Sequence, residues 1–227
     1  MEAMHSVSSS SIDARVSFIR KTYAHLMGAI LAFVGLEVML FQSGLAEVVA
    51  SAMLSVSWLL VLALFMGVAW AADWLAHSET SKAVQYVGLG LYVVAEAFLM
   101  TPLLYMAVAY SDPSVLPSAV VTTLVVFAGL TVAVFVTKKD FSFLRTALVV
   151  ASFGALGLII AATLFGFQLG MLFSVAMAVV AAGFVLYSTS NVLLHYNTHQ
   201  YVAASLALFS SVALMFWYIL RIFMGRD

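Results

Sequence analysis

Residues 118–137 read SAVVTTLVVFAGLTVAVFVT, twenty consecutive positions without a charged side chain. An α-helix of this length is about 30 Å long, which matches the thickness of the hydrocarbon core of a bilayer. A helix also satisfies its own backbone hydrogen bonds, as any segment surrounded by lipid must. The stretch therefore predicts a membrane-spanning helix.

Six further apolar stretches of similar length flank this one on both sides. Across all 227 residues, 65% are hydrophobic and 8% are charged, whereas soluble domains average about 25% charged residues. The sequence therefore predicts an all-α membrane protein, with one seven-helix transmembrane domain over residues 23–224 and a short C-terminal end, 225–227. The seven predicted spans are approximately 23–44, 50–74, 83–109, 118–137, 144–166, 171–194 and 201–224.

The N-terminal segment and the joints between spans indicate an orientation. Residues 1–22 are polar and include four consecutive serines, Ser8 to Ser11, so we expect a disordered cytoplasmic tail. With the N-terminus inside, only two basic residues, Arg221 and Arg226, lie on the outer side. Because Lys and Arg are enriched in cytoplasmic loops, their distribution favours this orientation. The seven basic residues then placed inside are Arg15, Arg20, Lys21, Lys82, Lys138, Lys139 and Arg145.

Two glutamates fall inside the predicted spans. Glu96 lies near the middle of the third span, and Glu37 lies about two thirds of the way across the first. An ionised carboxylate at that depth costs about 2.5–3.5 kcal/mol on insertion scales, so each should be protonated, partnered or facing water. No Lys or Arg occurs at matching depth, so we expect no buried ion pair. Two interpretations stay open: a proton-sensitive gate or cation site, and two protonated acids bonded to neighbouring helices.

A second group of polar residues occupies the sixth span, where Tyr187 and Asn191 flank Ser188-Thr189-Ser190. Ser188 and Asn191 are three apart and share a helix face. The seventh span carries serines at comparable depth, Ser205, Ser210 and Ser211. The two helices are therefore expected to form a hydroxyl-lined contact. It is either part of a functional site or a set of interhelical hydrogen bonds worth about 0.6 kcal/mol each.

Several kinds of chemistry have no support in the sequence. The chain has no cysteine, which excludes disulfides and thiol catalysis, and its net charge of −1 gives no basic patch for nucleic acid. His195 and His199 have helical metal-pair spacing but occupy a joint without an obvious third ligand. Hydrolase and nucleotide-binding motifs are also missing. We expect no enzyme, no cofactor and no metal site.

The chain resembles the Bax inhibitor-1 family, and the segments that carry the resemblance are spread over nearly its whole length. The first span opens with RKTY at 20–23, and the joint between the fourth and fifth spans reads TKKDFSFL at 137–144. The last two spans continue the match with LYSTSN at 186–191, YVAA at 201–204 and YILR at 218–221. The resemblance implies a seven-helix fold in which the other six helices surround the last one.

The resemblance also implies two functions. Some family members conduct a pH-regulated calcium leak attributed to an aspartate on each of the last two helices, and the matching positions here are Ser188 and Ser211. Serine does not ionise near pH 7, and calcium prefers carboxylate oxygens, so a calcium or proton leak is the alternative function. The Thr-Ser-Asn run and the final Arg226-Asp227 resemble the bacterial YccA-like branch.

That branch implies a multi-pass protein of the bacterial inner membrane, and the orientation favoured by the basic residues places its C-terminus in the periplasm. The branch also implies a modulator of membrane homeostasis that binds a membrane-anchored AAA protease of the FtsH type. A short polar tail, here residues 1–16, is the kind of segment that such a protease engages. The first expectation is therefore a protease modulator in contact with the lipid bilayer, and the alternative is the ion leak.

Overall fold

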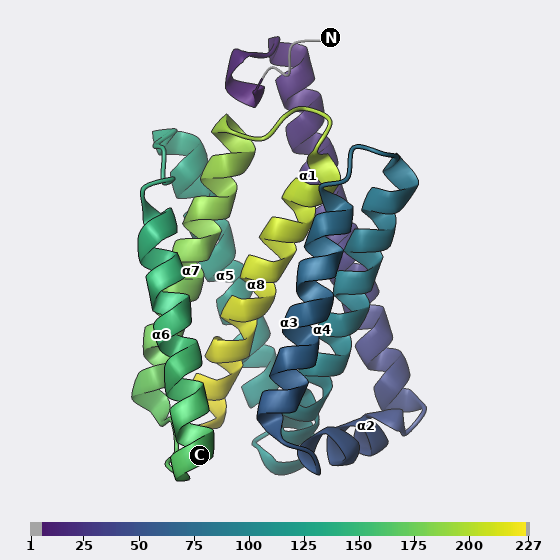
Figure 1. The fold of residues 1–227 in the computed structure, drawn as a ribbon, viewed down its shortest axis with the longest axis vertical. Helices are drawn as coiled ribbons and strands as arrows, with labels where there is room; N and C mark the ends of the chain where they lie inside the picture. The colour runs from purple at the N-terminus through teal and green to yellow at the C-terminus, as the bar shows by residue number, and fades with distance from the viewer. Residues whose placement is uncertain (1–5, 226–227) are drawn as a thin grey trace.

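Eight α-helices and one short 3-10 helix make up residues 6–225, the part of the chain that the computed structural model describes (Figure 1). The expectations for residues 1–5, Arg226 and Asp227 lie outside the described residues. The elements are η1 (Val7–Ser9), α1 (Ile12–Gln42), α2 (Leu45–Leu54), α3 (Trp58–Ala76), α4 (Lys82–Tyr110), α5 (Val115–Thr137), α6 (Leu144–Phe165), α7 (Met171–Leu194) and α8 (Tyr201–Met224).

Seven of these helices are long and apolar enough to cross a membrane, which confirms the predicted all-α, seven-span architecture. The second predicted span, 50–74, differs from the structure, because two helices occupy that region. Helix α2 ends at Leu54, Ser55 donates its hydroxyl to the Ala52 carbonyl at 2.7 Å, and Ser57 takes an extended backbone before α3 begins. With 10 residues, α2 is too short to cross a bilayer. It lies across the lower end of the bundle in Figure 1.

The N-terminal segment is more ordered than the sequence led us to expect. Helix α1 begins at Ile12, because the Ser11 side chain caps it by accepting a hydrogen bond from the Ala14 N–H at 3.4 Å. Residues 12–22 therefore belong to the first spanning helix. Val7 is fully buried, and its N–H donates to the carbonyl of Tyr196 at 2.9 Å. The described part of the expected tail thus packs on the bundle.

The last helix is the central one, as the resemblance implied. In α8, 72% of the apolar span is buried inside the protein, and in α4 the share is 61%, against 11–28% in the other five spans. Helix α8 crosses the middle of the bundle in Figure 1 and packs against α1, α3, α4, α5 and α7. Helix α6 packs chiefly on α7 at the outside of the bundle. A side chain on α8 can therefore reach several different helices.

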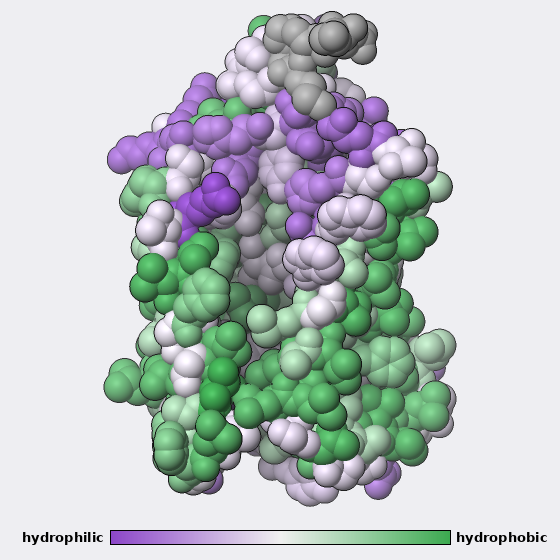
Figure 2. All heavy atoms as spheres, in the orientation of Figure 1, coloured by the Kyte–Doolittle hydropathy of each residue, from purple (hydrophilic) through white to green (hydrophobic). Residues whose placement is uncertain are grey.

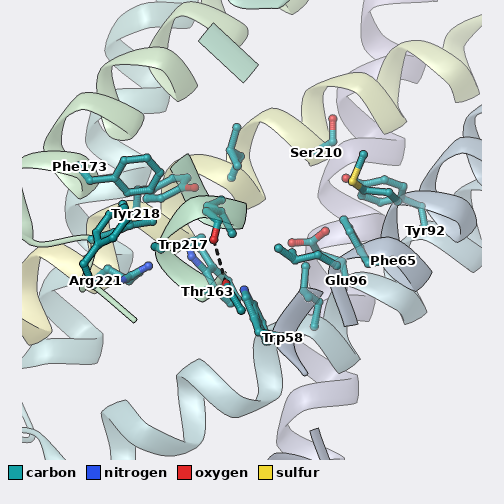
Figure 3. Close-up of a pocket in the computed structure, with 18 residues that line it drawn as sticks. Trp58, Phe65, Tyr92, Glu96, Thr163, Phe173, Ser210, Trp217, Tyr218 and Arg221 are labelled. Carbon is teal, nitrogen blue, oxygen red and sulfur yellow. Dashed lines mark hydrogen bonds between the residues drawn. The ribbon is translucent and has the colours of Figure 1, made fainter. Parts of the chain in front are cut away.

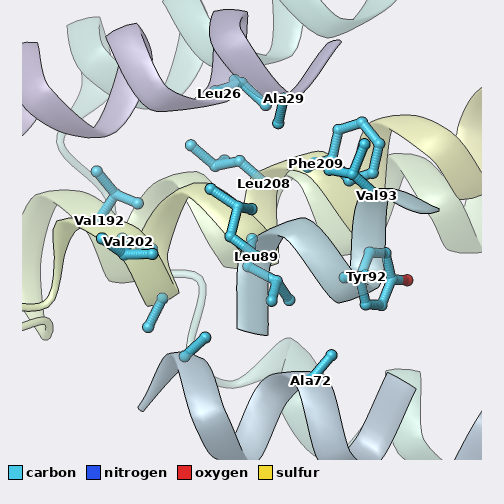
Figure 4. Packing of buried hydrophobic residues seen from close by; sticks show 14 of the residues in the cluster. Leu26, Ala29, Ala72, Leu89, Tyr92, Val93, Val192, Val202, Leu208 and Phe209 are labelled. Atoms are coloured by element: carbon cyan, nitrogen blue, oxygen red, sulfur yellow. The ribbon is translucent and has the colours of Figure 1, made fainter. Parts of the chain in front are cut away.

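Apolar side chains from α1, α4 and α8 form the core between these helices (Figure 4). Phe209 of α8 contacts the rings of Phe33 and Tyr92 edge to face, with centroid distances of 6.1 and 6.0 Å. Lipid is as apolar as these side chains, so close van der Waals packing stabilises the contact.

Hydrophilic side chains gather at the end of the molecule where the chain begins (Figure 2). Three joints and the N-terminal segment meet there: Val7 bonds to Tyr196, the Lys82 ammonium donates to the His199 carbonyl, and Asp140 bonds to His195. The predicted basic joints thus share one end of the bundle, and Arg221 lies near the other end of α8.

Candidate functional site

Ser188 of α7 and Ser211 of α8, the two positions singled out by the resemblance, lie in direct contact. Their hydroxyl oxygens are 3.0 Å apart, and only 5% and 4% of the two residues are exposed. Ser211 donates its single proton to the carbonyl of Ala207 at 2.8 Å, so Ser188 is the donor in the pair. The contact is a buried, uncharged hydrogen bond in which neither partner titrates near neutral pH.

Tyr187 and Asn191, which flank Ser188-Thr189-Ser190 in the sequence, form no side-chain hydrogen bond with this pair in the described part of the chain. They line a recess of about 430 Å³ at the polar end of the bundle. The Asp140 carboxylate near this recess accepts hydrogen bonds from the Ser142 N–H at 2.8 Å and contacts His195 Nε2 at 3.0 Å. Those two contacts lower the pKa of Asp140 below its ordinary value. The other residues lining the recess are His77, Ser142, Arg145, His195, Tyr196 and Gln200.

Glu96 lines a second cavity of about 430 Å³, bounded by α3, α4, α6 and α8 (Figure 3). Its position halfway along α4 puts it at the depth of the bilayer core, and it is 5% exposed. Figure 3 shows its carboxyl group directed into the open centre, across from Trp217. Trp58 and Trp217 stack on one side of this space with ring centroids 6.0 Å apart. The Glu96 carboxyl thus meets a half-open space between these helices.

The same cavity contains a cation that sequence reasoning did not pair with Glu96. Arg221 of α8 is one of the lining residues, although residue counting placed no Lys or Arg at matching depth. Among the described residues Arg221 forms no salt bridge with Glu96 within 4.0 Å. Among the described residues, the lining of the cavity therefore holds one acid and one base without direct contact, together with the hydroxyl-bearing residues Tyr92, Thr163, Ser210 and Tyr218.

Glu37 occupies a different place, between α1 and α4. It is 6% exposed, and its Oε2 lies 3.4 Å from the Thr101 hydroxyl oxygen, whose single proton is directed to the Ala97 carbonyl at 2.8 Å. Its other carboxyl oxygen has no partner in the described part of the chain. Thr101 follows Glu96 by five residues, which is about 140° around the helix and roughly 7.5 Å along it. The two glutamates therefore lie on different sides of α4, and the structure does not bring them together.

Ser210 and Ser211, consecutive residues of α8, connect the two parts of the candidate site. Ser210 lines the Glu96 cavity, whereas Ser211 faces α7 and bonds to Ser188. Neighbouring residues on an α-helix point about 100° apart, so the helix presents each serine to a different partner. Proton or cation binding is the chemistry that this arrangement permits, because Glu96 is the only carboxyl among the described residues that line the cavity.

Comparison with known sequences gives matches over nearly the whole chain. A family profile described as "Inhibitor of apoptosis-promoting Bax1" matches residues 15–227. Protein LIFEGUARD 4 of Arabidopsis thaliana is 27% identical over 227 residues, covering 96% of this chain and 88% of its own. LIFEGUARD 3 of the same plant is 27% identical over 157 residues, 65% of this chain and 60% of its own. The uncharacterised protein PA2604 of Pseudomonas aeruginosa is 33% identical over 113 residues, 48% of this chain and 50% of its own.

Proposed function

Because the chain belongs to the Bax inhibitor-1 family of multi-pass membrane proteins, we propose that it conducts protons or small cations slowly across the membrane, without enzymatic activity. Protonation of Glu96 regulates this leak. The observation that carries the proposal is the Glu96 carboxyl on the wall of a cavity at the depth of the bilayer core. Intramembrane acids that line cavities are typical of proton and ion pathways.

The geometry around α8 supports this role for Glu96. The family's regulatory pair is represented here by Ser188 and Ser211, which keep the contact between α7 and α8 at 3.0 Å but carry no charge. A pH-dependent change must then come from another buried acid. Glu96 lines a cavity on a different face of α8, which Ser210 also lines. Loss of its proton places a negative charge opposite Arg221 and changes the field inside the cavity.

The experiment is ion flux through purified protein in liposomes, measured with proton- and calcium-sensitive dyes from pH 5 to 8. We expect a slow flux with wild-type protein and loss of its pH dependence in Glu96→Gln. Glu37→Gln is the matched control, because it removes an equally buried carboxyl that does not line the cavity. Wild-type flux equal to that of protein-free liposomes, or an unchanged pH profile in Glu96→Gln, would overturn the proposal.

A second candidate is modulation of an FtsH-type membrane protease in a bacterial inner membrane, with the basic end of the bundle facing the cytoplasm. The observation in its favour is that Val7 fixes the N-terminal segment to the 195–200 joint, so a partner meets both at one surface. Removing residues 1–10 leaves the Ser11 cap and α1 in place. This deletion should abolish co-purification of the protease, as should the longer deletion of residues 1–16. Retention of the protease by both deletions would contradict this candidate.

A further inference from the structure

A groove of about 720 Å³ runs between α1 and α4 on the outside of the bundle, away from the Glu96 cavity. Its wall on α1 extends from Ala24 to Met39, and its wall on α4 extends from Tyr86 to Val94. From His25 to Met39 the helix rises roughly 21 Å, at 1.5 Å per residue. One leaflet of a bilayer core is about 15 Å deep. The groove is therefore long enough to hold an extended acyl chain.

Small residues make this surface concave. Gly28 and Gly35 lie two turns apart on the same face of α1, and Gly90 lies opposite on α4. A Cβ atom added at any of the three meets no other atom within 4 Å. Ala29, Leu89 and Val93, buried apolar residues of the core in Figure 4, are the most buried part of the groove's lining.

Basic and aromatic side chains surround the end of the groove nearest the polar end of the molecule. The ammonium groups of Lys21 and Lys82 lie 5.4 and 4.5 Å from the centroid of the Tyr201 ring. His25 lines the groove, donates its Nδ1–H to the Lys21 carbonyl at 2.7 Å, and places its Nε2 2.9 Å from the hydroxyl of Tyr86, another lining residue. In the described part of the chain neither lysine has a carboxylate within 4.0 Å.

We propose that this groove is a binding site for one anionic phospholipid. An acyl chain lies along Gly28 and Gly35, and the phosphate contacts Lys21 and Lys82. The charge at the mouth decides between this occupant and a helix from a second copy of the protein. A two-fold related copy would bring its own two lysines to the same depth, where like charges repel. A phosphate at that position is attracted by both ammonium groups.

The test is native mass spectrometry of the full-length protein in detergent, with phosphatidylglycerol or phosphatidylcholine of the same acyl chains. Wild-type protein should retain one phosphatidylglycerol and release phosphatidylcholine. The double variant K21Q/K82Q should bind phosphatidylglycerol about 25-fold more weakly, since each basic side chain near a phosphate contributes roughly a factor of five. K138Q/K139Q, which removes two charges from another joint, should bind like wild type, and K21R/K82R should retain binding.

A second pair of variants tests the groove independently of its charge. G28L/G35L fills the groove with side chains that meet open space, so the fold should persist while the lipid is lost. G154L/G157L is the control, because these two glycines of α6 also face open space and lie outside the groove. Equal retention of both lipids, or unchanged binding in K21Q/K82Q and G28L/G35L, overturns the proposal. A wild-type dimer that G28L/G35L converts to a monomer also overturns it, since the occupant is then a second copy.

Discussion

Gly88 of α4 is the position where a single added methyl group should do the most damage to helix packing. A Cβ atom there would lie 2.5 Å from the carbonyl oxygen of Ala72 and 2.6 Å from the backbone nitrogen of Ala76, both on α3. Ordinary contacts begin at 3.4 Å. These are backbone atoms and cannot rotate away, so Gly88→Ala must move the two helices apart by about 0.9 Å, the difference between 2.5 and 3.4 Å.

The substitution has two opposing effects on the free energy of unfolding: the helices pack less well, but alanine favours the helix more than glycine does. Overpacking of this kind costs about 1–3 kcal/mol, and replacing a helical glycine by alanine returns up to about 1 kcal/mol. We expect Gly88→Ala to lower the free energy of unfolding by about 1–2 kcal/mol. Gly90→Ala is the matched control on the same helix, because its Cβ meets nothing within 4 Å. It should leave stability unchanged or raise it by up to about 1 kcal/mol.

The assay is equilibrium unfolding in mixed micelles, followed by circular dichroism, with both variants compared under one set of conditions. Their free energies of unfolding should differ by about 2 kcal/mol, with Gly88→Ala the less stable. Because α3 and α4 both line the Glu96 cavity, the shift should also alter ion flux in liposomes. Equal stability of the two variants would show that α3 and α4 do not approach as closely as the argument requires.

Three further predictions concern the serine pair, the N-terminal segment and the polar end. A double-mutant cycle of Ser188→Ala and Ser211→Ala should give a coupling energy of about 0.6 kcal/mol in unfolding measurements; zero coupling would refute the hydrogen bond. Val7→Ala should speed amide exchange at residues 7–10 about tenfold, since loss of two buried methyl groups costs roughly 1–2 kcal/mol; unchanged exchange would mean that the segment is held by other contacts. The hydrogen bond of His77 to Asp73 raises the pKa of His77, so this contact stabilises the protein fully below about pH 6.5 and fades as the pH rises through the folded value. His77→Gln should remove that part of the pH dependence of unfolding, and an unaltered pH profile would count against the contact.

The seven spans were predictable because hydropathy alone identifies a segment that lipid must surround. The break between α2 and α3 was not, since Ser55, Val56 and Ser57 form a weak interruption in an apolar region. The start of α1 at Ile12 could have been predicted from the sequence. Ser11 is followed by Asp13 in the first turn, an arrangement typical of a helix N-terminus. The run of serines before it directed the prediction toward disorder instead.

The candidate site was predictable only in part, because a sequence gives depth and face but not which helices meet. Glu96 could be singled out because an ionised carboxylate is costly inside the bilayer. The cavity that it lines could not be predicted, because it depends on how α3, α6 and α8 pack around α4. Arg221 was missed because residue counting places its Cα near the end of the last span. A long arginine side chain can place its charge several ångströms from its Cα. The side chain of Arg221 lines the cavity that Glu96 also lines.

In the proposed leak, the position of α8 lets the chain carry two uncharged serines at the family's aspartate positions and still place an acid in a cavity beside the same helix. Ser211 faces α7 and Ser210 faces the Glu96 cavity, so one turn of the central helix takes part in two separate contacts. Hydroxyls in place of carboxylates on the α7 side leave no group there that titrates near neutral pH, and the Glu96 cavity on a different face of α8 keeps its acid. The acid then resides on α4, the other well-buried helix. In the proposed leak, a proton that binds Glu96 therefore acts on the cavity between α4 and α8, whereas the Ser188–Ser211 hydrogen bond between α7 and α8 contains no group that titrates near neutral pH.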